Sequence, residues 1–289
     1  MNYRHHYHAG NFADVWKHVL VVHLVAAMQR KENGFLYLDT HAGRGAYDLE
    51  SASRGDSLAR APEWPDGIGR LQEQAGLSEL VNGYLGLVQD FDRRQGGAVD
   101  GPRHYPGSPV LVQAMIRPQD RMVVCEKQED ECAQLSEQMA RGFRCSVQAT
   151  DGYRAVKAML PPPEKRALVL IDPPFESPKE FGDIANALKQ GLRRLPATVF
   201  AIWYPITDRA RVNTFFREIE GVELPPTVAI ELTVAGEEAP MKMRGCGLLV
   251  VNPPWKMQEE TGTALAQLAK LLAQASGGRS RFTWLVPDR

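Results

Sequence analysis

The feature that most constrains the fold of this chain is a series of short apolar runs that each end in an acidic residue. Residues 168–171 read Leu-Val-Leu-Ile and lead directly into Asp172, Pro173, Pro174 and Phe175. A continuous aliphatic run of this length predicts a strand that is buried on both faces of a parallel sheet. Ligands of such sheets bind beyond the carboxyl ends of the strands, so we expect Asp172 to face a cleft.

Three earlier apolar runs end in the same way. Their last residues are Asp39, Glu126 and Asp151, at the ends of residues 35–39, 121–126 and 146–151. One acidic strand end is most often an ordinary polar loop, but four in one chain favour a ligand site. Gly43-x-Gly45 follows the first of them, and an Asp-x-x-x-Gly-x-Gly element after a strand is typical of S-adenosylmethionine sites, whereas dinucleotide sites prefer a longer glycine motif.

The order of these runs predicts a role for the acidic residues of the second and third runs. Glu126 stands where a carboxylate would accept from the ribose hydroxyls of the cofactor. Asp151 would accept from its adenine amine, and the Gly152 N–H would donate to the ring.

Asp172 and the residues after it match one kind of chemistry, the methylation of an exocyclic amine. The lone pair of such an amine is delocalised into the ring, so a catalyst has to localise it with two acceptors on the amine protons. A carboxylate and the carbonyl of Pro173 supply these acceptors, and the prolines bring no competing N–H. Phe175 offers a stacking face for a base drawn out of its helix.

Motifs along the whole chain resemble one family of enzymes, the RlmJ family of bacterial 23S ribosomal RNA adenine-N6 methyltransferases. The matching segments begin at Tyr3-Arg4-His5 and His8-Ala-Gly-Asn-Phe-Ala-Asp14-Val-Trp-Lys17-His18. They continue through Leu38-Asp-Thr-His-Ala-Gly43, Tyr105-Pro-Gly-Ser-Pro109, Ile171-Asp-Pro-Pro174, Trp203-Tyr-Pro205 and Val251-Asn-Pro-Pro-Trp-Lys256. The resemblance implies a Rossmann-like class I methyltransferase fold.

The resemblance also implies site residues. Asp172 would be the catalytic acceptor. The residues that line the S-adenosylmethionine site would be His18, His41, Ser108, Glu126, Asp151, Gly152 and Asp172. Tyr3 would contact the RNA, and His5 and Lys17 would lie near the target base. Many amino-methylating enzymes have Tyr where this chain has Phe175, so stacking is retained here but a hydroxyl hydrogen bond is lost.

The domain organisation follows from a gap in the strand order. A second strand is expected about one helix after Gly45, but the next strand pattern begins near Met122. Residues 47–101 therefore predict an inserted helical subdomain, with helical spacing at Leu77, Leu80, Val81, Tyr84, Leu85 and Val88. Residues 1–46 would supply the first helix and strand of the methyltransferase domain, and residues 102–289 the remainder. Further strands are expected over 197–203, 227–233, 246–251 and 281–286.

The amino-terminal segment predicts a helix from Phe12 to Lys31, capped by Asn11. Its apolar stripe would be Val15, Val19, Val22 and Ala26. Lys17 and His18 fall off this stripe, where a ligand can reach them, although spacing alone favours a solvated surface lysine at position 17. Five of the seven histidines lie in residues 1–31, but their spacing argues against a metal site.

Three local features have competing interpretations. Asn252-Pro-Pro-Trp255 could be a second amine site, but it follows a last, antiparallel strand and is interpreted as a structural turn. Ser108 can cap a helix that runs to Arg117 as well as contact the cofactor. The polar loop at residues 235–245 could be a lid over the substrate.

Charge is distributed unevenly, although the net charge of the 289-residue chain is only −1. Residues 46–101 contain five basic and ten acidic residues, whereas residues 152–217 contain eleven basic and six acidic residues. Positive charge near the proposed amine site favours a phosphate-bearing substrate. We expect no membrane segment and no signal peptide, and the four cysteines lack metal-binding spacing, as in a cytoplasmic enzyme.

The expected reaction is direct transfer of a methyl group from S-adenosylmethionine to adenine N6, without a metal or a covalent enzyme intermediate. The product would be S-adenosylhomocysteine. The resemblance to the RlmJ family implies a monomer that acts on protein-free 23S RNA early in assembly. DNA adenine and a glutamine side chain remain alternative methyl acceptors, because the same loop serves both. A DNA-utilisation protein that has lost catalysis is the alternative from another class.

Overall fold

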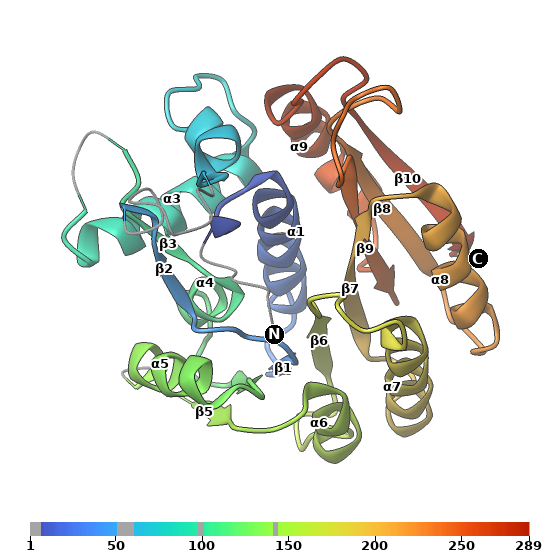
Figure 1. Ribbon diagram of the computed structural model, residues 1–289. Helices are drawn as coiled ribbons and strands as arrows, with labels where there is room; N and C mark the ends of the chain where they lie inside the picture. Colours follow the sequence, from blue (N-terminus) through green and yellow to red (C-terminus); the bar gives the residue numbers. More distant parts are fainter. Residues whose placement is uncertain (1–6, 51–60, 98–100, 141–143, 289) are drawn as a thin grey trace.

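The computed structural model describes residues 7–50, 61–97, 101–140 and 144–288 of the chain (Figure 1). Its main sheet has eight strands in the order β10-β8-β9-β7-β6-β1-β4-β5. The strands are β1 (Leu36–Asp39), β4 (Arg121–Cys125), β5 (Cys145–Gln148), β6 (Ala167–Ile171), β7 (Val199–Ile206), β8 (Thr227–Thr233), β9 (Gly245–Val251) and β10 (Arg279–Val286). All eight strands that the sequence predicts are present, each within two or three residues of its expected bounds.

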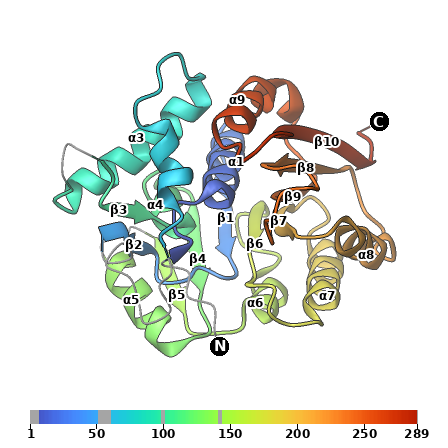
Figure 2. The ribbon, with the colours of Figure 1, turned by 45° about the horizontal axis from the view of Figure 1, so that its top comes forward.

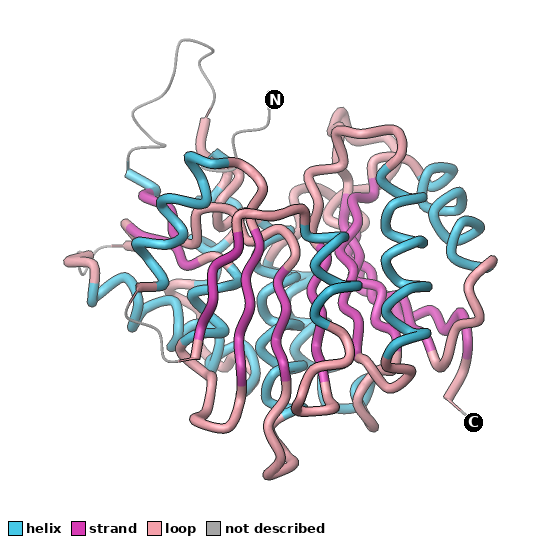
Figure 3. The backbone as a smooth tube through the Cα atoms, turned by 90° about the horizontal axis from the view of Figure 1, so that it is seen from below, coloured by secondary structure: helices cyan, strands magenta, loops and turns pink. Residues whose placement is uncertain are grey.

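The sheet is parallel in its first part and antiparallel in its last. β1 lies between β4 and β6 and is parallel to both, and β5 and β7 extend the parallel part on either side. β9 is antiparallel to β7 and to β8, and β10 is antiparallel to β8. The antiparallel direction that the sequence predicts for residues 246–251 is therefore confirmed, but this strand is not the last one, because β10 follows it in the chain. The tube in Figure 3 shows the strands side by side.

Helices cover both faces of the sheet (Figure 2). Buried side chains of α1 (Phe12–Met28), α3 (Glu79–Arg94), α4 (Ser108–Gln113), α5 (Glu129–Met139) and α9 (Met257–Leu271) belong to one hydrophobic cluster. Those of α6 (Gly152–Met159), α7 (Glu180–Arg194) and α8 (Arg209–Glu220) belong to a second cluster. Apolar strand residues contribute to both clusters, which is why the strand sequences are continuously apolar.

Helix α1 begins where the sequence predicts and ends three residues early, at Met28. The Asn11 side chain accepts hydrogen bonds from the N–H groups of Ala13 and Asp14 at 2.9 and 3.0 Å, as an N-cap does. The predicted apolar stripe is only part of the buried surface, because every residue of the helix except Ala26 is buried. Ala26 itself is exposed, contrary to the prediction.

The inserted residues between β1 and β4 are tied to the rest of the fold. Strands β2 (Ala46–Asp48) and β3 (His104–Pro106) pair antiparallel at its two ends. Two 3-10 helices, η2 (Trp64–Asp66) and η3 (Ile68–Leu71), precede α3. The apolar spacing predicted for α3 is confirmed for Val81, Tyr84, Leu85 and Val88, which are buried. Leu80 is only partly buried, and Leu77 lies before the first residue of the helix. The buried side chains share the hydrophobic cluster of α1, so the insertion and the sheet bury one continuous core on this face.

Asn252-Pro-Pro-Trp255 is a structural turn, as the sequence predicts. The Asn252 amide donates to the carbonyls of Pro196 and Thr198 at 2.8 and 2.9 Å. Because β9 runs antiparallel to β7, its end meets the beginning of β7 and lies at the opposite edge of the sheet from Asp172.

None of the helices in the described ranges is long and apolar enough to cross a membrane.

Candidate active site

The four acidic strand ends lie side by side at one edge of the sheet. The order β6-β1-β4-β5 places Asp172, Asp39, Glu126 and Asp151 on neighbouring parallel strands. Backbone hydrogen bonds join the strand ends, from Thr40 N–H to the Leu170 carbonyl at 3.0 Å and from Ala42 N–H to the Cys125 carbonyl at 2.9 Å. The carboxylates therefore converge on the crevice beyond β1 and its neighbours, where ligands of open parallel sheets bind.

The turn after β1 brings backbone to the surface of this crevice. Gly43 and Gly45 have φ angles of +59° and +84°, a region that favours glycine. The Gly43 N–H donates to Oε2 of Glu126 at 3.0 Å, and the Gln128 N–H donates to Oε1 at 2.8 Å. Gly152 lies so close to Thr40 that a Cβ would come within 2.0 Å of the Thr40 carbonyl oxygen. The glycines thus let three loops meet at the ends of β1, β4 and β5.

Asp39 is fully buried and organises this turn. It accepts hydrogen bonds from the Ser108 hydroxyl at 2.6 Å, from the Tyr37 hydroxyl at 3.2 Å and from the His41 N–H at 3.3 Å. Burial raises the pKa of Asp39 to about 6, although the hydrogen bond from Ser108 lowers it.

The predicted cap role of Ser108 is wrong. Gly107 is the N-cap of α4, and the helix ends at Gln113 instead of Arg117. Ser108 instead occupies the first position of the helix, which leaves its hydroxyl free to bind Asp39.

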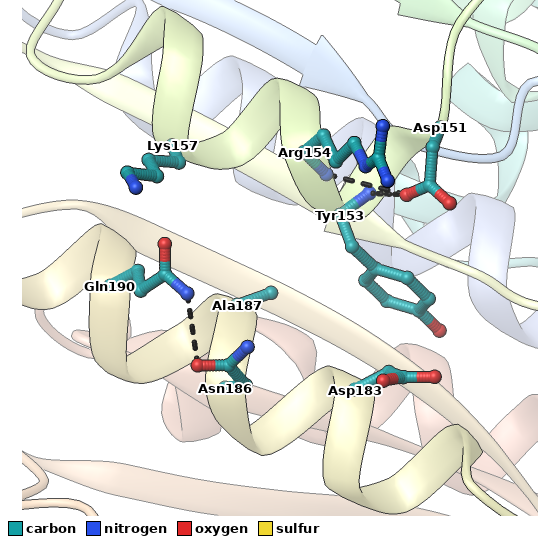
Figure 4. Close-up of a pocket in the computed structure, with 8 residues that line it drawn as sticks. All are labelled: Asp151, Tyr153, Arg154, Lys157, Asp183, Asn186, Ala187 and Gln190. Atoms are coloured by element: carbon teal, nitrogen blue, oxygen red, sulfur yellow. Dashed lines mark hydrogen bonds between the residues drawn. The ribbon is translucent and has the colours of Figure 1, made fainter.

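Asp151 has the structural role that its position before a helix favours. Its Oδ1 accepts from the N–H groups of Tyr153 and Arg154 at 3.0 and 3.3 Å, and so caps α6. Oδ2 lies 3.5 Å from the Lys127 ammonium. A pocket of about 400 Å³ opens beside Asp151, between α6 and α7 (Figure 4). Its lining is mostly polar and includes Arg154 and Lys157.

His41 is neutral at physiological pH. Burial lowers its pKa to about 4, although Asp172 and Asp151 act in the opposite direction. Its Nδ1 lies 2.8 Å from the Thr40 hydroxyl, and its ring meets the ring of Tyr153 edge-on with centroids 5.0 Å apart. The Thr40 hydroxyl donates to the Leu170 carbonyl at 2.9 Å, so the His41 Nδ1–H donates to Thr40, and Nε2 of the neutral ring can accept one hydrogen bond from a ligand.

His18 is buried within a chain of hydrogen bonds. Its Nδ1 lies 2.7 Å from the Tyr105 hydroxyl, which lies 2.8 Å from the Tyr84 hydroxyl. The rings of His18 and Tyr105 also stack, with centroids 5.6 Å apart. Helix α1 is thus linked to β3 and to α3 of the insertion.

Lys17 is buried and bridges two carboxylates, so it is not the solvated surface lysine that spacing favours. Its ammonium lies 2.6 Å from Oδ2 of Asp172 and 2.8 Å from Oδ1 of Asp14. The pKa of Lys17 is raised, because Asp14 and Asp172 together outweigh the opposing effect of burial. Lys17 is therefore a permanent cation beside Asp172.

The residues after Asp172 form a compact loop. Pro173 is buried, and Phe175 is half-buried with a φ of +52°. The Phe175 ring lies against Phe181 and Trp203, with centroids 5.8 and 5.7 Å away. The predicted RNA contacts Tyr3 and His5 lie outside the described residues.

The crevice fits S-adenosylmethionine by the chemistry of its side chains. Carboxylates on three neighbouring strand ends match a ligand that carries two ribose hydroxyls and two amino groups, and glycine backbone allows close approach of a nucleoside. Within the described ranges, no three His, Cys, Asp or Glu side chains cluster as a metal ion would require. The sheet order, the glycine turn and the acidic strand ends define the class of the protein, an S-adenosylmethionine-dependent methyltransferase with a Rossmann-like fold.

Comparison with known proteins narrows the class to a family. Residues 32–286 match the family model described as ribosomal RNA large subunit methyltransferase D, RlmJ, and the chain belongs to this family. It is 33% identical over 288 residues to the ribosomal RNA large subunit methyltransferase J of Escherichia coli K12, and equally identical to that of Haemophilus influenzae. Both alignments cover 100% of each chain.

A solved structure has the same fold. A crystal structure of a Legionella pneumophila protein superposes with a TM-score of 0.84 and 30% identity, covering 98% of this chain and 99% of that one.

Sequence reasoning missed three residues of the site. Asp14, Thr40 and Tyr105 appear in the quoted motifs, but no role was predicted for them. The spacing of Asp14 and Lys17, three residues apart on a helix, is a signal that could have found their ion pair. The hydrogen bonds of Thr40 and Tyr105 depend on distant segments and leave no local signal.

Proposed function

We propose that the protein methylates N6 of an adenine in 23S ribosomal RNA, as a cytoplasmic monomer that acts on protein-free RNA early in assembly. The observation that carries the proposal is the place of Asp172. Its half-buried carboxylate follows β6, next to the glycine turn of β1, and one of its oxygens is held by a buried lysine. Such a carboxylate can accept a proton of an exocyclic amine at the place where a methyl donor fits.

Residues at the ends of β1, β4 and β5 would hold the cofactor. Glu126 would accept from the ribose hydroxyls and Asp151 from the adenine amine, with the Gly152 N–H donating to the ring. His18, His41 and Ser108 would line the remainder of the site. When bound, S-adenosylmethionine supplies an electrophilic methyl group on a positively charged sulfur atom.

Groups of the protein itself would orient the amine for methyl transfer. Asp172 and the carbonyl of Pro173 would accept hydrogen bonds from the two N6–H groups, which directs the nitrogen lone pair away from the ring. Lys17 supports this role, because its ammonium holds one oxygen of the Asp172 carboxylate in place at 2.6 Å. Phe175 would stack on the adenine, an interaction that contributes about 1–3 kcal/mol per base. Tyr3 and His5 would contact the RNA and the region of the target base.

The proposal is tested by transfer of a labelled methyl group to several acceptors. Protein-free 23S RNA, assembled large subunits, DNA and a glutamine-containing protein substrate are compared, and the modified nucleotide is identified by mass mapping. We expect N6-methyladenine in protein-free 23S RNA. Transfer to DNA or to protein alone would support one of the alternative acceptors, and a failure to bind S-adenosylmethionine in calorimetry would favour a protein without catalytic activity.

The substitution Asp172→Ala tests the catalytic residue. We expect it to reduce transfer by at least about a hundredfold, since removing an oriented group at the reacting atoms has effects of this size. The fold should remain, as judged by circular dichroism. The control is Asp90→Ala, which removes an exposed carboxylate of α3 that pairs with Arg93. Comparable transfer by the Asp172→Ala protein would show that another group accepts the amine protons.

A further inference from the structure

Asp14 is a buried carboxylate whose two oxygens are both engaged. Oδ2 accepts from the Gly10 N–H at 3.0 Å, and Oδ1 accepts from the Lys17 ammonium at 2.8 Å. The side chain is 4% exposed. Gly10 is itself fixed, because its carbonyl accepts from the Ile68 N–H of η3 at 2.8 Å. Asp14 therefore holds Lys17 from a rigid position in the first turn of α1, next to the contact of Gly10 with the insertion.

Asp172 is less constrained than Asp14. Its side chain is 16% exposed, and Oδ2 accepts from Lys17 at 2.6 Å. Within the described part of the chain, Oδ1 of Asp172 accepts no hydrogen bond. Lys17 thus fixes one oxygen of the carboxylate and leaves the other available to a ligand.

The charges of the three residues also favour a positively charged ligand. Two carboxylates and one ammonium leave the trio with a net charge of −1. Without the charge of Asp14, the positive charge of Lys17 would be balanced by Asp172 alone. Nitrogen becomes positively charged as an amine is methylated, and a preorganised negative charge stabilises such a transition state.

We propose that Asp14 is a positioning residue for methyl transfer, acting on Asp172 through Lys17. It anchors the ammonium that orients the Asp172 carboxylate, and it offsets the positive charge of Lys17, so that Oδ1 of Asp172 faces the amine with its negative charge uncompensated. This inference rests on the proposed function. It assigns Asp14 no contact with the substrate.

The test is a double-mutant cycle of Asp14→Asn and Lys17→Met, read as single-turnover methyl transfer to 23S RNA. Asn removes the charge of Asp14 and keeps an acceptor for the Gly10 N–H. We expect Asp14→Asn to lower the rate at saturation by about tenfold or more, as for other oriented polar groups, while KM for RNA and the Kd of S-adenosylmethionine change less than about twofold. In the Lys17→Met background, the same substitution should have almost no further effect on the rate.

The control is Asp120→Asn, which neutralises another buried carboxylate, held by Arg117 just before β4 at the opposite edge of the sheet. We expect this variant to keep the wild-type rate at saturation. Wild-type transfer in the same assay tests the proposed function separately. With an active wild type, a normal rate in Asp14→Asn would overturn the role of Asp14. An equal loss with and without Lys17 would also overturn it, because Asp14 would then act by another route.

Discussion

Lys17 and Asp172 form a partly buried ion pair of 2.6 Å, although they are 155 positions apart in the sequence. The pair joins the first turns of α1 to the loop after β6. It places a permanent cation beside the carboxylate that follows β6. This one contact joins the part of the site on α1 to the part at the strand ends. Several further consequences of the site geometry can be measured.

The ionisation of Asp39 should make the stability of the protein depend on pH. Burial raises its pKa to about 6 in the folded protein, from an ordinary value of 3.8. The protonated form of Asp39 stabilises the folded protein relative to the unfolded chain. This contribution to stability is fully present below pH 3.8 and is lost as the pH rises through 6. Relative to wild type, Asp39→Asn should therefore become more stable over this interval, by up to about 3 kcal/mol.

Urea unfolding of both proteins at several pH values checks this expectation. Asn keeps one acceptor oxygen, for the Ser108 and Tyr37 hydroxyls, and loses the acceptor of the His41 N–H. That loss does not depend on pH, so the change of the stability difference with pH reports the charge of Asp39. A difference in the free energy of unfolding that stays constant between pH 4 and 7 would show that Asp39 titrates normally.

Gly152 should not tolerate a side chain. A Cβ at this position would meet the Thr40 carbonyl oxygen at 2.0 Å, so Gly152→Ala has to displace backbone at the end of β1. We expect a loss of about 1–3 kcal/mol in the free energy of unfolding, as for other overpacked sites. S-adenosylmethionine should also bind more weakly in calorimetry.

Gly83→Ala is the matched control for that substitution. Gly83 lies within α3 and has open space where a Cβ would stand. Alanine has the higher helix propensity, so this variant should be up to about 1 kcal/mol more stable and bind the cofactor normally. If Gly152→Ala behaved like Gly83→Ala, the close contact with Thr40 would be wrong.

The hydroxyl of Tyr105 should support the cofactor side of the site. Tyr105→Phe removes its contacts with His18 and Tyr84, at an expected cost of about 1–3 kcal/mol in the free energy of unfolding. Because His18, which we propose to line the cofactor site, loses this partner, the affinity for S-adenosylmethionine should fall several-fold. Tyr204→Phe is the control, since it removes a buried hydroxyl contact with Glu231. Equal cofactor affinity in both variants would argue against a role for the Tyr105 hydroxyl.

The buried Glu231 of β8 is explained by its partners. Arg209 donates to both of its carboxylate oxygens, at 2.7 and 3.0 Å, and the Tyr204 hydroxyl donates at 3.0 Å. Arg209→Leu leaves this carboxylate without its cation and should cost about 2 kcal/mol, less than a fully buried pair because the Arg209 side chain is 46% exposed. Methyl transfer should not change.

Chemical denaturation of Arg209→Leu, alone and combined with Glu231→Gln, measures this effect. The second substitution removes the unpaired charge and keeps an acceptor for Tyr204. It should restore part of the lost stability. A further loss in the double variant would mean that Glu231 contributes by packing and not by its charge.

The central strands β1, β6 and β9 were predictable because every residue in them is buried, which leaves a continuous apolar signal in the chain. The edge strands β5 and β10 are only partly buried. The two short strands β2 and β3 were not predictable, since three residues carry no readable period. The apolar stripe of α1 was also incomplete, because a helix covered on nearly all sides has little amphipathic pattern.

Local pattern was enough to locate the elements and the acidic residue at the end of each parallel strand. Propensity, apolar runs and glycine turns are properties of neighbouring residues, and they survive in any arrangement of the strands. The order β6-β1-β4-β5, the burial of Lys17 between two carboxylates and the link from His18 to Tyr84 come from pairing between distant segments. Such pairings form only when the whole core is buried at once. The tertiary structure therefore determines them, and local sequence pattern does not predict them.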